Sequence, residues 1–125
     1  MNKFYYQGIL VRSSEREYTH AVVNTDGEFS KKKLVACSGS YTNALKVIQR
    51  AVSERESNIR FNETALKAMR AGKPGFMAKS GTHTYPYRFE PGDTEESLLA
   101  DIERVRASVD YITKNWKVVE LTKGE

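Results

Sequence analysis

The stretch LVACSGSYTNALKVIQRAV, residues 34–52, contains the change from strand to helix that decides the fold class. Its first residues, the short apolar run Leu34–Ala36, end a strand expected over 29–36 that has three lysines, Lys31 to Lys33, near its start. Ser38-Gly39-Ser40 interrupts that run, and Ser40 is a suitable N-cap for a helix over about 41–57. Apolar side chains recur along this helix at 3.6-residue spacing, at Ala44, Ile48, Ala51 and Val52. The stretch therefore predicts a strand that leads directly into an amphipathic helix.

Two more strands are predicted on the N-terminal side of this stretch. Residues 4–11 and 18–24 are rich in aromatic and β-branched side chains, and a short polar segment separates them. An Asp-Gly turn at 26–27 leads into the strand over 29–36, which completes a three-stranded antiparallel meander. The lysines at 31–33 fit either a solvated, protected strand edge, which we favour, or a contact with an anion.

The second half of the chain predicts helices and one more strand. A second helix is expected over about 62–72 and a long one over about 94–115. Between them, residues 72–93 hold all three prolines and four of the eight glycines, so this segment is expected to be irregular. Residues 117–121 form the last expected strand. The long helix carries an apolar stripe made of Leu98, Ile102, Val105, Val109 and Ile112.

These elements define an α+β fold: a small antiparallel β-sheet, made of the N-terminal meander plus the C-terminal strand, packed by two or three helices. A length of 125 residues fits a single domain over 1–125. No apolar run approaches the roughly 18 residues of a membrane span, and the first residues have no signal-peptide core. We therefore expect a soluble protein of the cytoplasm.

The metal-binding inventory of the chain is small. The one cysteine, Cys37, excludes an internal disulfide and is consistent with a reducing compartment. His20 and His83 lie far from Cys37 and from each other in the sequence, so we expect no metal site. No cofactor-binding motif is present, and we expect no cofactor.

The positive charge is concentrated in the first half of the chain. The net charge is +4, and residues 1–60 hold ten Lys/Arg against six Asp/Glu, whereas residues 61–125 hold ten of each. A basic first half favours an anionic partner such as nucleic acid, a nucleotide or an acidic protein. Binding of a nucleic-acid polymer normally requires a longer basic surface, so a localised anionic site fits this charge better.

The sequence offers little for catalysis and more for passive recognition of a ligand. It contains no phosphate-binding glycine-rich loop, no nucleophile elbow and no zinc-protease motif, so we expect no enzyme. Arginines can bind phosphate with two parallel hydrogen bonds, and aromatic rings can stack on a base. These groups suit the binding of a nucleotide.

Three parts of the chain could supply such a ligand site. Arg55 lies on the apolar stripe of the first helix, where it either covers the core with its stem or meets a phosphate at a pocket floor. The aromatic residues of segment 82–89 either cap the core or stack on a base. A third set lines one face of the long helix and fits either a subunit contact or an ordinary surface: Ser97, Ala100, Arg104, Ser108 and Tyr111.

Three segments resemble a family of small phage proteins, the first type of Thoeris anti-defence sponges. They are the opening Gly8–Ser14, the strand Tyr18–Val23 and the strand-to-helix step Ser38–Ala44. The resemblance rests on sequence motifs in roughly the first 50 residues and, in the rest of the chain, on the general layout of the elements alone. It implies a non-enzymatic protein that sequesters cyclic ADP-ribose-type signals made by bacterial TIR proteins. It also implies dimers or higher oligomers with pockets near subunit contacts, some of which hold cyclic oligonucleotides.

Pockets of that family use arginines, an aromatic stacking residue and Asn or Asp. Residues of matching type and rough order in this chain are Arg55, Tyr85, Tyr87, Asp93, Arg104 and Arg106. The resemblance thus predicts a phage-encoded sponge for a cyclic nucleotide in the host cytoplasm, without a membrane partner. Two alternatives remain: a small basic regulator that binds RNA or DNA, and an inhibitor that binds a host protein directly.

Overall fold

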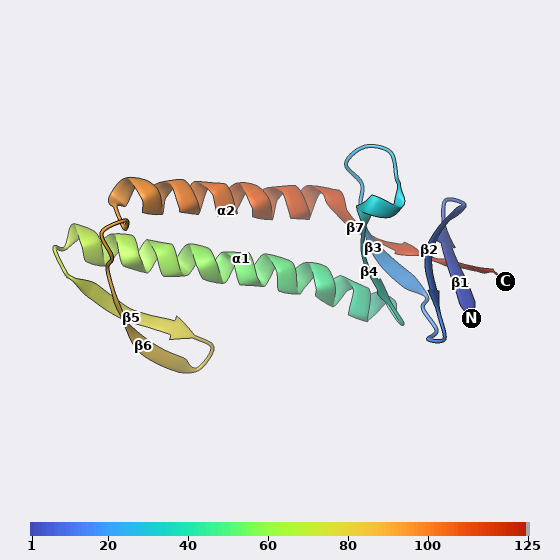
Figure 1. Ribbon diagram of the computed structural model, residues 1–125, viewed down its shortest axis with the longest axis horizontal. Helices are drawn as coiled ribbons and strands as arrows, with labels where there is room; N and C mark the ends of the chain where they lie inside the picture. Colours follow the sequence, from blue (N-terminus) through green and yellow to red (C-terminus); the bar gives the residue numbers. More distant parts are fainter. Residues whose placement is uncertain (125) are drawn as a thin grey trace. The chain divides into compact units, whose positions relative to one another are not determined.

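A computed structural model describes residues 1–124 and confirms the α+β class (Figure 1). These residues form two α-helices, eight strands and one short 3-10 helix. In chain order these are β1 (Asn2–Tyr6), β2 (Ile9–Ser14), β3 (His20–Asn24), η1 (Lys31–Lys33), β4 (Leu34–Ser38), α1 (Tyr41–Arg70), β5 (Gly75–Ser80), β6 (His83–Arg88), α2 (Glu95–Asn115), β7 (Trp116–Glu120) and β8 (Thr122–Gly124). Within the described residues, neither helix is both long and apolar enough to cross a membrane.

The chain divides into two compact units. The first, here called the terminal unit, comprises Met1–Val52 together with Tyr111 and the residues after it. The second, here called the central unit, comprises Ser53–Asp110. Both boundaries fall inside a helix, so α1 and α2 each contribute residues to both units.

The terminal unit contains two three-stranded antiparallel sheets, with the strand orders β2-β1-β8 and β4-β3-β7. The expectation of one strand over 4–11 is wrong, because the chain turns at Gln7-Gly8 and forms the β1–β2 hairpin. Both turn residues have positive φ, 50° at Gln7 and 75° at Gly8, which glycine adopts without strain. Aromatic and apolar residues on both sides of this turn made two short strands look like one.

Strand β3 is the centre of its sheet and of the apolar interior of the terminal unit. It pairs with β4 on one side and with β7 on the other. Its residues Ala21, Val22 and Val23 are at most 1% exposed. The strand expected over 117–121 is confirmed as β7, and it joins β3 as a direct neighbour.

Helix α1 is continuous where two helices were expected. The prediction of a helix end near 57 and a new start at Asn62 is wrong. No glycine or proline occurs between Tyr41 and Arg70, so the backbone has no reason to stop. Asn62 is a nearly buried helix-interior residue whose side-chain amide donates a hydrogen bond to the Asn58 Oδ1, 3.0 Å away.

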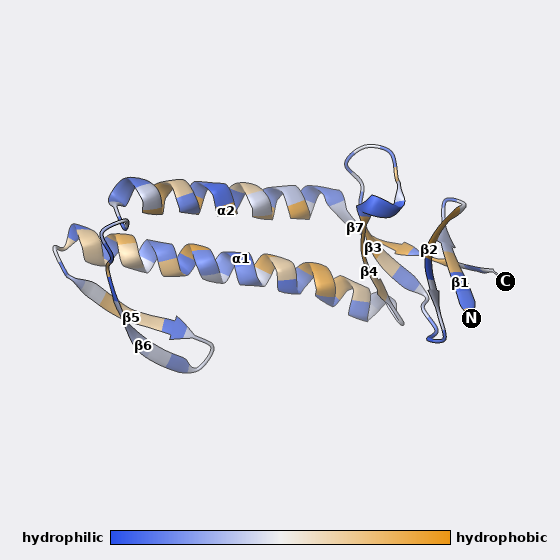
Figure 2. Ribbon diagram, in the orientation of Figure 1, coloured by the Kyte–Doolittle hydropathy of each residue, from blue (hydrophilic) through white to orange (hydrophobic). Residues whose placement is uncertain are grey.

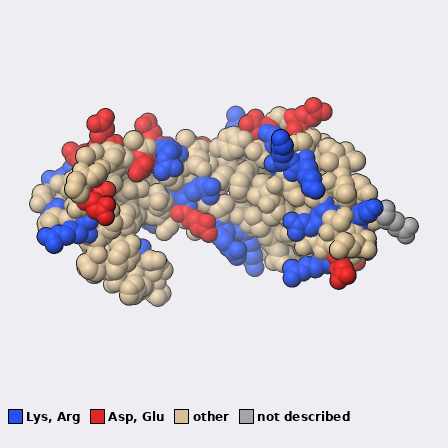
Figure 3. Space-filling view, in the orientation of Figure 1, with Lys and Arg blue, Asp and Glu red and all other residues tan. Residues whose placement is uncertain are grey.

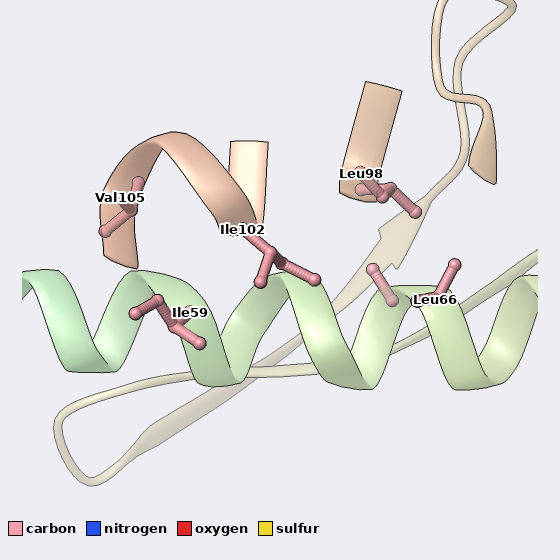
Figure 4. Packing of buried hydrophobic residues seen from close by; sticks show 6 residues of the cluster. Ile59, Leu66, Leu98, Ile102 and Val105 are labelled. Atoms are coloured by element: carbon pink, nitrogen blue, oxygen red, sulfur yellow. The ribbon is translucent and has the colours of Figure 1, made fainter. Parts of the chain in front are cut away.

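Helix α2 matches the expected long helix. Thr94 caps it: its Oγ1 accepts the Ser97 backbone N–H at 3.1 Å, and the Ser97 Oγ accepts the Thr94 N–H at 3.0 Å. Its apolar stripe packs on α1 in the central unit, as the close view shows (Figure 4), and apolar residues colour bands of both helices in Figure 2. The buried cluster consists of Ile59, Ala65, Leu66, Leu98, Ile102 and Val105.

The segment expected to be irregular contains the β5–β6 hairpin. One face of the hairpin packs on α1, where the Phe61 ring meets the rings of Phe76 and Tyr87 with centroids 5.2 and 5.5 Å apart. Ala78 on the same face is 1% exposed. This face extends the apolar interior of the central unit.

Candidate functional site

A basic hollow in the terminal unit is the strongest candidate for an anion site. It has a volume of about 430 Å³ and is lined by Val11, Arg12, Ser13, Ser14, Lys31 and Leu34. Two of these residues are cations, two carry hydroxyl groups, and none is a carboxylate. We call it the Arg12–Lys31 pocket.

Local structure explains why these side chains gather there. β2 is an edge strand of its sheet, and its Val11 side chain points inward and is 2% exposed, while its neighbour Arg12 is exposed. The lysines expected at the start of a strand instead form the 3-10 helix η1, which contacts β2. This turn brings Lys31 to the edge strand that carries Arg12.

The electrostatic surroundings of Arg12 keep its charge available. Its guanidinium lies 5.5 Å from the centroid of the Tyr18 ring, a cation–π contact that orients the group. Burial raises the pKa of the Cys37 thiol, and the nearby Arg12 charge lowers that pKa by less. The thiol is therefore neutral at pH 7 and does not offset the arginine. Among the described residues, neither Arg12 nor Lys31 forms an ion pair.

The excess positive charge follows the division into units. Met1–Val52 holds eight Lys/Arg and four Asp/Glu, and the residues from Tyr111 onward hold three and two, so the terminal unit has a net charge of +5. The central unit holds nine Lys/Arg and ten Asp/Glu, a net charge of −1. An anionic ligand is therefore attracted to the unit that contains the Arg12–Lys31 pocket.

Two of the residues nominated by sequence, Tyr87 and Asp93, lie together. The Tyr87 hydroxyl donates a hydrogen bond to the Asp93 Oδ2 at 3.1 Å, which raises the pKa of the tyrosine. The same carboxylate oxygen accepts the Glu90 N–H at 2.8 Å. The Tyr87 ring packs against Phe61, Phe76 and Phe89. These contacts fit the interpretation that the aromatic residues of this segment cap the core.

The nominated arginines contact other parts of the central unit. The Arg55 Nε donates a hydrogen bond to the Ser108 Oγ at 2.8 Å, and Arg106 lies 3.7 Å from a Glu63 oxygen, so both link α1 with α2. Arg104 lies 3.4 Å from an Asp101 oxygen on its own helix, and its side chain is 72% exposed. Tyr85 pairs with Ala78 across the hairpin.

The expected subunit-contact face of α2 has contacts within the chain. Ser97 belongs to the helix cap, and Ser108 accepts the Arg55 hydrogen bond. The Tyr111 hydroxyl accepts the side-chain N–H of Asn24 and donates to the Asp26 Oδ2, both at 3.0 Å. With the contact of Arg104 to Asp101, four of the five residues assigned to that face thus contact polar groups of the same chain.

Sequence reasoning missed the pocket residues Arg12, Ser13 and Ser14. They were assigned to a polar turn, and Lys31 lies some 17 residues further along the sequence, so nothing linked the two segments. The lysine run was the one available signal, and contact with an anion was the less favoured of its two interpretations.

No metal centre is found among the described residues, which contain no group of three or more His, Cys, Asp or Glu side chains placed to hold an ion. Comparisons with protein-family models, with curated proteins and with solved structures gave no significant match.

Proposed function

We propose that the protein binds a cyclic nucleotide signal and sequesters it without cleaving it, as a phage-encoded sponge in the host cytoplasm. The ligand would be a cyclic ADP-ribose isomer or a cyclic oligonucleotide, held by a dimer or higher oligomer. The observation that carries the proposal is the Arg12–Lys31 pocket. Gly8–Ser14, one of the segments that resemble the sponge family, supplies four of its six lining residues.

The chemistry of this pocket suits a phosphate group. The planar Arg12 guanidinium can donate two parallel hydrogen bonds to phosphate oxygens, and Lys31 adds a point charge. The hydroxyls of Ser13 and Ser14 can donate further hydrogen bonds. Because no carboxylate lines the pocket, a phosphate meets no repulsion there. Its volume of about 430 Å³ lies in the range of small-molecule sites.

The test combines a thermal-shift screen with calorimetry on the purified protein. Its ligands are cyclic ADP-ribose isomers, cyclic di- and trinucleotides, and short RNA and DNA. A ligand at 100 times its Kd stabilises the fold by about 2.7 kcal/mol, which raises the Tm by several degrees. The variant Arg12→Ala should weaken binding about 10- to 100-fold, because it removes charge-assisted hydrogen bonds.

Two controls make the result specific. Lys46→Ala removes the same charge from an exposed site on α1 in the same unit, and it should leave the affinity unchanged. The ligand released on denaturation should have its original mass. A cleaved ligand would instead indicate an enzyme, and equal losses in Arg12→Ala and Lys46→Ala would move the site away from the pocket.

A nucleic-acid-binding regulator is the second candidate, favoured by the net charge of +5 on the terminal unit and by the lysines of η1. Binding of a polymer would weaken steeply with salt, because each neutralised phosphate releases counterions. A steep salt dependence with RNA or DNA, and no thermal shift with any cyclic nucleotide, would establish this function in place of the sponge.

A further inference from the structure

The outer face of the β5–β6 hairpin, opposite the face on α1, has an apolar centre open to solvent. Side chains alternate along each strand, so the packing of Phe76 and Ala78 on the inner face places Met77 and Lys79 outside. Met77 is 61% exposed and pairs with Pro86 of β6. A hollow of about 630 Å³ lies along the hairpin here; Pro74, Met77 and Pro86 line it, together with Phe76 and Tyr87.

The hairpin also has one free backbone edge. The Phe89 backbone N–H donates a hydrogen bond to the Pro74 carbonyl at 3.0 Å, so Pro74 and Phe89 form a hydrogen-bonded pair next to the first pair of the antiparallel ladder. Bonded and non-bonded pairs alternate, so Gly75, Met77 and Lys79 direct their N–H and C=O groups away from β6. Among the described strands, β5 pairs with β6 alone.

The two edges of the hairpin differ because of one proline. The same alternation points the backbone nitrogen of Pro86 outward, where it has no hydrogen to donate. The outer edge of β6 therefore lacks its central donor, whereas the outer edge of β5 keeps all of its donors. An added strand would form a complete ladder on β5 only.

The charges around this surface select the chemistry of a partner. Residues 71–89 contain three cations, Lys73, Lys79 and Arg88, and no Asp or Glu. Lys73 and Arg88 line the hollow, and Lys79 lies on the same outer face. Figure 3 shows the hairpin as a mostly uncharged surface in the view that it presents. Lysine on a free edge opposes pairing with a second basic edge and attracts a strand that carries carboxylates.

We propose that the β5 edge binds an extended acidic peptide of a partner protein by strand addition. The peptide backbone pairs with Gly75, Met77 and Lys79. An apolar side chain of the peptide lies beside Met77, and carboxylates two residues away on either side meet Lys79 at one end and Lys73 or Arg88 at the other. The partner motif is thus acidic-x-apolar-x-acidic. This site lies in the central unit and is independent of the Arg12–Lys31 pocket.

The test measures binding of the protein to a fluorescent heptapeptide with the sequence Thr-Glu-Thr-Leu-Thr-Glu-Thr. Met77→Pro removes the outward N–H at the centre of β5 without breaking a β5–β6 hydrogen bond, and Met77→Val keeps that N–H. We expect Met77→Pro to weaken binding at least about tenfold relative to Met77→Val, because the central bond of the ladder is lost. The melting temperatures of the two variants show whether both are folded.

Charge is tested separately. Lys79→Glu should weaken binding of the acidic peptide about fivefold or more, whereas Lys46→Glu, the same change on an exposed site of the terminal unit, should not. A peptide with lysines in place of the glutamates should bind more weakly to the unaltered protein.

Three outcomes would overturn the proposal. The first is no binding of the acidic peptide at millimolar concentration. The second is equal binding to folded Met77→Pro and Met77→Val, which would exclude strand addition. The third is preferential binding of single-stranded DNA of equal charge, unaffected by Met77→Pro, which would indicate a phosphate-binding surface.

Discussion

Arg12 shows how a single residue connects the pocket to a measurable property of the terminal unit. Its guanidinium lies over Tyr18, lines the Arg12–Lys31 pocket and lowers the pKa of the Cys37 thiol. Burial of the thiol has the larger effect, so the pKa of Cys37 stays above its ordinary value of 9.0. The unfolded thiol ionises near pH 9 and the folded one only at higher pH, so this group stabilises the fold below pH 9 and loses that effect as pH rises further.

Replacing Arg12 should therefore make Cys37 less reactive. Arg12→Gln removes the charge that favours the thiolate, which raises the pKa of Cys37 further. At pH 8, alkylation by iodoacetamide should be slower than in the unaltered protein by about twofold, and faster again in urea. Arg16→Gln is the matched control, since it removes the same charge just beyond the end of β2 and Arg16 does not shift the pKa of Cys37. Equal alkylation rates in the two variants would mean that Arg12 does not lie beside Cys37 in solution.

At the residue scale, residue type and rough order were enough to nominate candidates but not to say which of them meet. Tyr87 and Asp93 were nominated by type, and the structure pairs them. The approach of Arg12 to Lys31 was missed, because it depends on the 3-10 turn η1, which contains no glycine or proline. Contacts between residues distant in sequence are set by the packing of the sheets, which local periodicity does not encode.

At the scale of elements, periodicity predicted the kinds of structure better than their ends. The apolar stripe of α2 was predicted correctly, because five apolar residues at helical spacing indicate an amphipathic helix. The run 4–11 was divided by a turn, and the expected break before Asn62 was absent. At Gly8 the turn signal was given too little weight against the strand propensity on both sides, and at Asn62 the capping signal was given too much weight against the surrounding helix propensity. Boundary residues such as Gly8 and Asn62 support more than one local structure.

The close approach of β5 and β6 gives a sharp test of the hairpin. A Cβ at Gly75 would overlap the Tyr87 carbonyl oxygen and lie 3.1 Å from the Arg88 Cα, and neither backbone atom can move freely. Gly75→Ala should therefore lower the free energy of unfolding by about 2 kcal/mol, measured by urea denaturation. Gly92→Ala is the control, because no atom lies within 4 Å of its Cβ position and its φ is not positive. Similar stability of the two variants would contradict the register of the hairpin.

At the scale of the whole molecule, the two units differ in charge but share both helices. The terminal unit carries +5 and the central unit −1, while α1 passes from Val52 to Ser53 without a break. Composition predicted the basic half of the chain, because charge is counted directly from the sequence. Two units were not predicted, because the boundary lies within continuous helix and carries no linker composition.

A helix that is continuous across the boundary should transmit unfolding from one unit to the other. Ser53 is exposed in the interior of α1, so Ser53→Pro removes one helical hydrogen bond and causes a backbone clash without disturbing the buried cluster. We expect the free energy of unfolding to fall by about 3 kcal/mol or more. Because the proline interrupts the shared helix, hydrogen exchange should then show residues 1–52 and residues 53–110 opening separately. Ser53→Ala should leave the stability unchanged or slightly raised, because alanine is the better helix former. If Ser53→Pro unfolded at the same urea concentration as Ser53→Ala, α1 would have to be interrupted at the boundary between the two units.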